Sequence, residues 1–269
     1  MKVQGKVIVV TGAGGGIGRE LVLHLLKNGA RVAGVDLNSM SLQETEERAS
    51  TSDERFHGSV VNITDREAVE ALPQEIINRF GSVDGIINNA GVIQPFVRLN
   101  DLDYATIHRI FDVNFFGALY VTKAFLPYLL QRPEAHIVNV SSMGGLVPFP
   151  GQTVYGAAKA AVKLMTEGLA AELINTRVKV TVVIPGAVAT NIMENSGVKM
   201  SVTPPSEGGG GMTALSPAEA AQIIVRGIER DEYHVLIGKD VKMIDKFYRL
   251  SPAFAARTLA KKMRALLPA

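Results

Sequence analysis

Short runs of β-branched and other apolar residues alternate along the chain with longer segments in which apolar residues recur at helical spacing. The first run, residues 6–11, ends in a cluster of glycines, and residues 17–28 then place Leu21, Leu25 and Leu26 on one side of a helix. This alternation continues to residue 237. It predicts strands at residues 6–11, 31–36, 56–61, 83–88, 136–140, 178–184 and 233–237, and helices at residues 17–28, 39–49, 65–80, 102–130, 152–175 and 217–230.

Most of the predicted strands are nearly continuous apolar runs, which is typical of strands buried on both faces. Seven such strands separated by helices predict an α/β fold with a single doubly wound, seven-stranded parallel sheet of Rossmann type and helices on both faces. We expect residues 1–238 to form this one domain and residues 239–269 to form a helical extension. Residues 191–215 would form a substrate loop, whose glycine-rich part is either a surface excursion or a flap over a ligand.

The composition narrows the class of protein. Of the 269 residues, 47% are hydrophobic and 20% are charged, which is typical of a globular chain with a large core. The absence of cysteine excludes disulfides, a thiolate-ligated zinc and a cysteine nucleophile, and it is compatible with the cytoplasmic location that we expect. No apolar run is long enough to span a bilayer, and the five histidines are too widely separated to indicate a metal site.

Charge is distributed unevenly along the chain. Residues 239–269 hold eight basic and two acidic residues, a local charge of +6, so a total of +2 leaves the remainder at −4. A mildly acidic body lacks the broad positive surface of a nucleic-acid-binding protein. The extension has the pattern of a basic amphipathic helix pair. It could dock on the protein or its oligomer, which we favour, close over a pocket, or lie on an anionic membrane surface.

The glycine cluster after the first strand indicates a phosphate-binding loop. Five glycines lie between this strand and the first helix, where a sharp turn presents backbone amides to an anion, although Ile17 stands where the strict dinucleotide fingerprint requires glycine. Asp36, which ends the second strand 20 residues after Gly16, is placed to accept hydrogen bonds from both hydroxyls of an adenosine ribose. Because its carboxylate would repel a 2′-phosphate and no basic residue stands at Gly15 or Leu37, NAD is favoured over NADP.

Tyr155 and Lys159 are four residues apart at the start of a predicted helix, so their side chains share one face. A neighbouring ammonium favours the ionised form of a phenol, and we expect Lys159 to lower the pKa of Tyr155 toward working pH. Such a phenol can donate and accept a proton. The pair taken alone is also compatible with an ordinary exposed helix face.

Six motifs in order make the chain resemble the classical short-chain dehydrogenases/reductases over residues 5 to about 238. The matching segments are Thr11-Gly-Ala-Gly-Gly-Gly-Ile-Gly18, Asn88-Asn-Ala-Gly91, Asn114, Ser142 thirteen residues before Tyr155, Tyr155-Gly-Ala-Ala-Lys159 and Pro185-Gly-Ala-Val-Ala-Thr190. The resemblance implies an oxidoreductase that transfers a hydride between a nicotinamide dinucleotide and an alcohol or carbonyl group. A non-catalytic NAD-sensing protein and a lyase or epimerase on the same fold remain alternatives.

The resemblance also implies roles for individual residues. Tyr155 would be the catalytic acid/base, Lys159 would hold the nicotinamide ribose, Ser142 rather than Ser141 would bind the substrate oxygen, and the backbone of Asn114 would hold a relay water. Asn62 stands where the family usually has an aspartate beside the adenine. The implied cofactor-binding set is Gly12, Gly14, Gly15, Gly16, Ile17, Gly18, Asp36, Leu37, Asn62, Ile63, Asn89, Ala90, Gly91, Tyr155, Lys159, Pro185, Gly186, Val188 and Thr190.

The loops after the fourth, fifth and sixth strands are rich in apolar residues, which predicts a pocket for a lipophilic substrate such as a steroid-like, long-chain or aromatic alcohol or ketone. The alternative is that these loops pack on one another or on a second subunit. Since relatives commonly assemble through the helices that here contain Asn114 and Tyr155, we expect a homodimer or homotetramer. The apolar residues are Val92, Ile93, Pro95, Phe96, Met143, Leu146, Val147, Pro148, Phe149, Ile192, Met193, Val198 and Met200.

Overall fold

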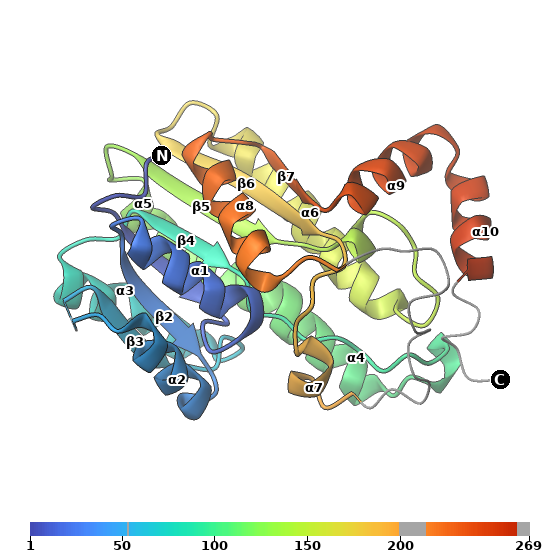
Figure 1. Cartoon of the computed structure of the whole chain (residues 1–269), viewed down its shortest axis with the longest axis horizontal. Helices are drawn as coiled ribbons and strands as arrows, with labels where there is room; N and C mark the ends of the chain where they lie inside the picture. The colour runs from blue at the N-terminus through green and yellow to red at the C-terminus, as the bar shows by residue number, and fades with distance from the viewer. Residues whose placement is uncertain (53, 199–213, 263–269) are drawn as a thin grey trace.

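The seven predicted strands form one parallel sheet in the order β3-β2-β1-β4-β5-β6-β7 (Figure 1). The computed structural model of the chain describes residues 1–52, 54–198 and 214–262. The fold is therefore the predicted Rossmann-type sheet. Its strands are β1 (Val7–Thr11), β2 (Arg31–Asp36), β3 (Phe56–Val60), β4 (Gly85–Asn88), β5 (Ala135–Val140), β6 (Val178–Pro185) and β7 (His234–Ile237).

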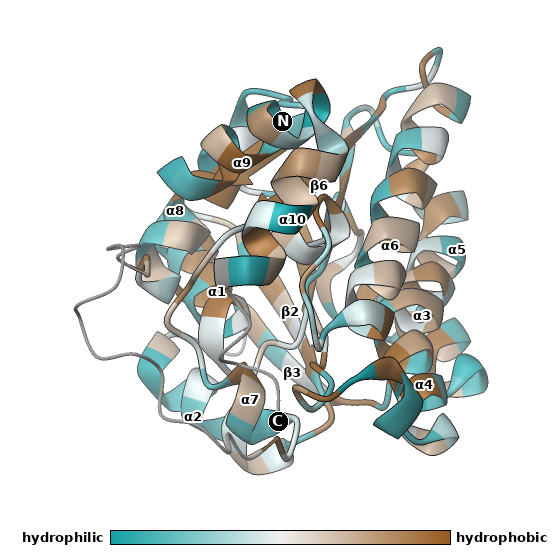
Figure 2. Ribbon diagram, turned by 90° about the vertical axis from the view of Figure 1, so that its right-hand side faces the viewer, coloured by the Kyte–Doolittle hydropathy of each residue, from teal (hydrophilic) through white to brown (hydrophobic). Residues whose placement is uncertain are grey.

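Helices cover both faces of the sheet. On one face α1 and α8 pack on β1 and its neighbours, and on the other face α3 and α5 do so, each layer through a core of buried aliphatic side chains (Figure 2). Successive residues of a strand point to opposite faces of the sheet, and both faces are buried in these two cores. Most strands are therefore nearly continuous apolar runs in the sequence. The principal helices are α1 (Gly16–Lys27), α2 (Ser39–Ala49), α3 (Arg66–Phe80), α4 (Tyr104–Phe111), α5 (Ala118–Leu129), α6 (Thr153–Glu172) and α8 (Pro217–Glu229).

Side chains and glycines set the ends of several helices. Asp65 caps α3 by accepting a hydrogen bond from the Ala68 N–H, and Gly81, at a φ of 82°, ends the same helix. Ser216 and Glu219 form a reciprocal capping box at the start of α8. These local signals explain why most predicted boundaries lie within a few residues of those in the structure.

The predicted helical region 102–130 is not one regular helix. It contains α4, a π-helical turn η2 (Asp112–Gly117) and α5 in direct succession. A π-turn widens the hydrogen-bond ring, and such turns are frequent at functional sites. Asn114 lies in the middle of this turn and is buried.

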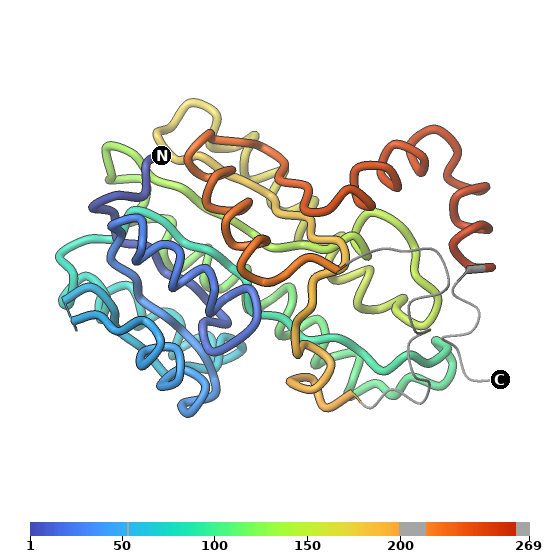
Figure 3. Tube along the Cα trace, in the orientation of Figure 1, coloured from blue at the N-terminus to red at the C-terminus, as the bar shows by residue number. Residues whose placement is uncertain are grey.

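After β7 the chain forms two further helices, α9 (Lys239–Leu250) and α10 (Pro252–Lys262), which extend from the end of the body that carries the carboxyl ends of the strands (Figure 3). Of their side chains, Val241 and Ala255 are fully buried. The remainder of the extension, and residues 199–213 of the predicted substrate loop with Met200, lie outside the described residues. The first part of that loop holds a short helix, α7 (Ile192–Asn195).

Candidate active site

A cleft of about 750 Å³ opens at the carboxyl ends of the strands. The strand order changes direction between β1 and β4, and ligands of doubly wound sheets bind at such a switch point. Of the residues predicted to bind a cofactor, all but Gly18 line this cleft; Ser142 lines it too, whereas Asn114 does not. The lining members of the set are Gly12, Gly14, Gly15, Gly16, Ile17, Asp36, Leu37, Asn62, Ile63, Asn89, Ala90, Gly91, Tyr155, Lys159, Pro185, Gly186, Val188 and Thr190.

The glycine loop joins β1 to α1 in a turn that requires glycine. Gly12 and Gly16 have φ values of 69° and 50°, in the left-handed region. Gly18 was predicted to bind the cofactor, but it lies in the first turn of α1, away from the cleft lining. A Cβ there would overlap the Gly12 carbonyl oxygen and lie 2.6 Å from the Asn89 side-chain nitrogen. Gly18 therefore permits close packing of α1, and the start of this helix faces the cleft at Gly15, Gly16 and Ile17.

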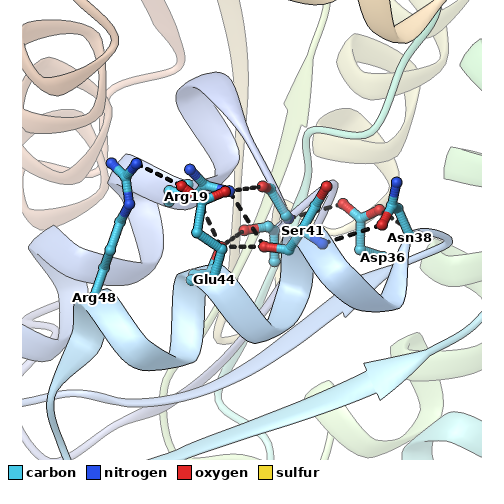
Figure 4. Close-up of polar contacts among 9 residues, drawn as sticks. Arg19, Asp36, Asn38, Ser41, Glu44 and Arg48 are labelled. Atoms are coloured by element: carbon cyan, nitrogen blue, oxygen red, sulfur yellow. Dashed lines mark hydrogen bonds and ion pairs between the residues drawn. The ribbon is translucent and has the colours of Figure 1, made fainter.

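Asp36 is held on the cleft wall by the loop itself. Its two carboxylate oxygens accept hydrogen bonds from the backbone N–H groups of Gly14, at 2.8 Å, and Asn38, at 2.9 Å (Figure 4). A carboxylate oxygen has more than one lone pair, so both oxygens retain capacity for a ligand hydroxyl. This fixed negative charge sits at the opposite end of the glycine loop from Tyr155.

Arg19, on α1, ties the glycine loop to α2 and was not predicted from the sequence. Its guanidinium donates hydrogen bonds to the carbonyl oxygens of Gly14 and Ser41 and pairs with Glu44 at 2.7 Å (Figure 4). These hydrogen bonds from Arg19, together with those from Arg48, hold the pKa of Glu44 below its usual value. The guanidinium of Arg19 is therefore already engaged by protein groups.

The two asparagines that end β4 have different surroundings. The side chain of Asn88 points into the core and donates hydrogen bonds to Asn139 at 2.7 Å and Thr122 at 3.0 Å. The backbone N–H groups of Asn89 and Ala90 donate to the hydroxyl of Thr11, at 3.0 and 3.1 Å. The end of β1 thus holds the segment that lines the cleft.

Asn62 lies at the end of the cleft near β2 and β3. Its side-chain oxygen accepts hydrogen bonds from the backbone N–H and the hydroxyl of Thr64, at 3.1 and 2.9 Å. The Asn62 amide is therefore oriented by its own loop. An aspartate at this position could accept the same hydrogen bonds from Thr64.

Tyr155, Ser142 and Lys159 meet at the other end of the cleft. Tyr155 lies in the first turn of α6. A Cβ at Gly144 would meet both the Tyr155 ring, at 3.4 Å, and the Ser142 hydroxyl, at 3.6 Å, so the two side chains are neighbours. Ser142 also accepts a hydrogen bond from the Gly144 N–H at 3.1 Å, which orients its side chain. The hydroxyl of Ser141, by contrast, donates to the backbone carbonyl of Lys159 at 2.7 Å and is buried, so it supports α6.

The structure corrects one expectation about charge. Lys159 does not contact the Tyr155 phenol; its ammonium donates to the carbonyl oxygen of Val140 at 3.0 Å, and burial lowers its pKa to about 8. Burial also raises the pKa of Tyr155, although the hydrogen bond with Ser142 opposes this shift. In the protein alone Lys159 therefore does not bring the phenol toward ionisation, because desolvation disfavours the charged forms of both groups.

Asn114 supports the site from behind the wall. Its side-chain oxygen accepts from the Val92 N–H at 3.2 Å, and its amide donates to the carbonyl oxygens of Val92 and Ile110, both at 2.9 Å. A Cβ at Gly91 would lie 2.7 Å from the Asn114 oxygen and 3.2 Å from the Lys159 nitrogen. Gly91 thus allows the asparagine and the lysine to approach the segment that follows β4.

Arg109, Asn191 and Asn195 also line the cleft and were not predicted. Arg109 comes from α4 and donates to the carbonyl oxygen of Ser196 at 3.1 Å. It is the charged group that analysis of the loops alone had missed, since it reaches the cleft from a helix. Within the described residues no group of three or more acidic or histidine side chains is arranged to hold a metal ion, and no helix is long and apolar enough to cross a membrane.

Fold and cleft together define a Rossmann-type protein with a site of dinucleotide dimensions, and comparison with known proteins identifies its family. The sequence model of the short chain dehydrogenases matches residues 6–200. The chain therefore belongs to the short-chain dehydrogenase/reductase family and is an NAD(P)-dependent oxidoreductase of that family.

Individual relatives agree with this assignment. The chain is 36% identical to SadH, an inferred oxidoreductase of Mycobacterium tuberculosis, with 98% of each chain covered. It is 33% identical to 3-oxoacyl-(acyl-carrier-protein) reductase FabG of Thermotoga maritima, over 84% of this chain and 91% of FabG.

Two solved structures of the family resemble the whole fold. A short-chain dehydrogenase of Burkholderia cenocepacia in complex with NADP has a TM-score of 0.80 at 28% identity, over 96% of this chain and 99% of that one. A family member from Burkholderia phymatum in complex with NAD has a TM-score of 0.85 at 24% identity, over 94% and 96%.

Proposed function

We propose that the protein transfers a hydride between NAD(H) and a secondary alcohol or ketone, with Tyr155 as the general acid/base. The observation that carries this proposal is the placement of Tyr155, Ser142 and Lys159 in the same cleft as the glycine loop and Asp36. A protein that only binds a dinucleotide has no need of a phenol and a serine hydroxyl side by side in that cleft.

The cleft has the groups that a dinucleotide requires. Asp36 would accept the hydroxyls of the adenosine ribose, the start of α1 at Gly15 would bind the pyrophosphate, and Lys159 would hold the ribose next to the nicotinamide. A Cβ at Gly15 would make only an ordinary van der Waals contact, 3.7 Å from the Asn195 side-chain nitrogen, so the protein does not crowd this part of the loop. When bound, NAD accepts the hydride in alcohol oxidation, and NADH supplies it in ketone reduction.

The residues of the chain move the proton. In oxidation the ionised Tyr155 phenol takes the hydroxyl proton of the substrate while Ser142 orients the same oxygen; in reduction the phenol returns a proton to the carbonyl oxygen. Since burial raises the pKa of Tyr155 in the protein alone, a positive charge within the cleft favours its ionisation.

We infer the substrate class from apolar side chains of the loops at this end of the sheet, where Val92 and Ile192 line the cleft. Ile93, Phe96, Met143, Phe149 and Ile192 come from the loops after β4, β5 and β6 and are only partly buried. Apolar surface of this kind favours a lipophilic alcohol or ketone over a sugar or a small hydroxy acid. A panel of matched ketones, long-chain, aromatic and steroid-like against hydroxylated and carboxylated, should show higher kcat/KM for the lipophilic members; the reverse order would exclude this substrate class.

We further propose NAD rather than NADP as the cofactor, because the fixed carboxylate of Asp36 repels a 2′-phosphate and Arg19 is already paired with Glu44. We expect NADH to bind at least about tenfold more tightly than NADPH, the scale of one charged contact. The Asp36→Ala change should narrow this difference, and Glu46→Ala, on the adjoining helix, is the matched control. Fluorescence titration with NADH and with NADPH measures the two dissociation constants in each variant. Equal affinities in the unmodified protein would contradict the role given to Asp36.

The extension leaves large apolar side chains exposed in a single chain. Met243, Leu250 and Phe254 on α9 and α10 are 67%, 85% and 60% exposed, and the rings of Phe247 and Phe254 pack edge to face at 5.6 Å. We propose that a second copy of the chain covers this surface in a homo-oligomer. Exposed apolar side chains on α6, such as Leu164 at 70%, support assembly through the long helices as well.

Replacing Leu250 by Glu should weaken this assembly, because it puts a charge into the proposed contact, and the subunit dissociation constant should rise at least about tenfold. Met40→Glu, at a similarly exposed apolar residue of α2, should leave the mass in solution unchanged. Analytical ultracentrifugation distinguishes the two. If the Leu250 variant kept its mass while losing the ability to sediment with anionic vesicles, the extension would be a membrane contact instead.

A further inference from the structure

Gln94 is a buried polar residue outside the roles described so far. It lies three residues after Gly91, in the segment that follows β4, and it is 1% exposed. Both polar atoms of its side chain and its backbone carbonyl oxygen have partners on or beside α6, 57 to 61 residues further along the chain. Burial of an amide is costly unless its groups are paired, so this arrangement fixes the side chain in one place.

The amide of Gln94 caps the helix that carries Tyr155. Its oxygen accepts hydrogen bonds from the backbone N–H groups of Val154, at 3.0 Å, and of Tyr155 itself, at 2.8 Å. Its nitrogen donates to the carbonyl oxygen of Gly151 at 2.9 Å. The first N–H groups of a helix have no partner within the helix. The residue at the N-cap position, Gln152, makes no side-chain cap here, so the cap comes from a distant loop.

Gln152 returns the contact. Its side-chain nitrogen donates to the backbone carbonyl oxygen of Gln94 at 3.0 Å, which makes a reciprocal pair of glutamines between the loop and the helix. The two halves of this pair differ in one respect. Gln94 holds the backbone of Tyr155, whereas Gln152 holds only the backbone of Gln94.

The same loop is attached to the rest of the site. Val92 is clamped by Asn114, and the Ile93 N–H donates to the hydroxyl of Ser196 at 2.9 Å, at the end of α7. A run of three residues thus connects Gly91, Asn114, the substrate loop and Tyr155. The amide cap is also uncharged, so it satisfies the helix terminus without placing a carboxylate beside a phenol that must ionise.

We propose that Gln94 is a positioning residue for catalysis: through the N–H of Tyr155 it fixes the first turn of α6, so that the phenol stays in register with Ser142 and the cofactor. This inference rests on the proposed function in assigning proton transfer to Tyr155. Small displacements of a catalytic group reduce turnover strongly, by as much as about 10²-fold for 1 Å. Loss of the cap should therefore affect kcat more than KM or cofactor binding.

The test compares Gln94→Met, which removes the cap with little change in volume, with Gln152→Met as the matched control. Substrate is the ketone that the panel shows to be turned over best, and NADH binding is titrated in parallel. We expect Gln94→Met to lower kcat at least about tenfold with KM and the NADH dissociation constant within about threefold, and Gln152→Met to leave kcat within about threefold. Gln94→Glu keeps an oxygen acceptor for both N–H groups but places a carboxylate near the phenol, so the Tyr155 amide should still exchange slowly while kcat stays below that of the unmodified protein.

Hydrogen exchange provides a readout that does not depend on the reaction. The amide protons of Val154 and Tyr155 should exchange at least about tenfold faster in Gln94→Met than in Gln152→Met, while amides in the middle of α6 exchange alike in both. Should Gln94→Met not fold, Gln94→Asn, whose shorter side chain withdraws the amide, takes its place. Equal kcat in the Gln94 and Gln152 variants would overturn the proposal, as would unchanged exchange at Tyr155; absence of turnover in the unmodified protein would instead count against the proposed function.

Discussion

Replacing Tyr155 by phenylalanine is expected to lower kcat by at least about 10²-fold, the usual contribution of a general acid/base. The change removes only the hydroxyl to which we assign proton transfer, so NADH affinity should stay within about twofold. Steady-state kinetics and NADH titration measure the two effects separately.

Tyr104→Phe is the matched control for this change. Tyr104 starts α4 and is 80% exposed, so loss of its hydroxyl should leave kcat and NADH affinity unchanged. If the Tyr155 variant retained more than about a tenth of the wild-type kcat, against the loss expected for a general acid/base, another residue would have to be the proton donor.

The second large effect is expected at Gly18. Alanine there would place a methyl group against the Gly12 carbonyl and the Asn89 side chain, so α1 must shift or the loop must open. Overpacking of this kind costs about 1–3 kcal/mol of stability. Because the affected atoms form the turn to which we assign pyrophosphate binding, we expect NADH affinity to fall at least about tenfold as well, the factor that corresponds to about 1.4 kcal/mol.

Gly168→Ala provides the comparison for that variant. Gly168 lies on the exposed face of α6, where an added Cβ would meet nothing within 4 Å. It should raise the free energy of unfolding by about 0.5–1 kcal/mol, as alanine does in a helix. Denaturant unfolding and NADH titration of both variants measure these effects. A Gly18→Ala protein as stable as wild type and with normal NADH affinity would show that the loop accommodates a Cβ at position 18, contrary to this prediction.

The sequence predicted the order of strands and helices because the sheet is parallel and covered on both faces. Most strands, such as Val7–Thr11, are short runs rich in apolar residues, and turn residues such as Gly81 separate them from the neighbouring elements. The π-turn at Asp112–Gly117 could not be foreseen, since a change of hydrogen-bond register leaves little trace in apolar spacing.

Within the site, prediction succeeded where a motif is local and stopped where contacts are long-range. The glycine loop and the Tyr155–Lys159 pair each occupy a few consecutive residues. Within each motif, spacing alone therefore places the residues near one another. Arg19, Arg109 and Gln94 reach the site from a helix face or across about sixty residues, and no local pattern indicates their contacts. Burial also has no local signature, which is why the direction of the Tyr155 pKa shift was predicted wrongly.

Transfer of deuterium from NADH labelled at the position that donates the hydride is a direct test of the proposed hydride transfer. With the best lipophilic ketone of the panel, we expect one deuterium on the carbinol carbon of the product alcohol for each NADH oxidised, and loss of this transfer in Tyr155→Phe. The proposed hydride transfer would be contradicted if the protein bound NADH and NAD but no ketone oxidised the NADH and no alcohol reduced the NAD. It would also be contradicted if the new carbon-bound hydrogen of the product alcohol came from the solvent.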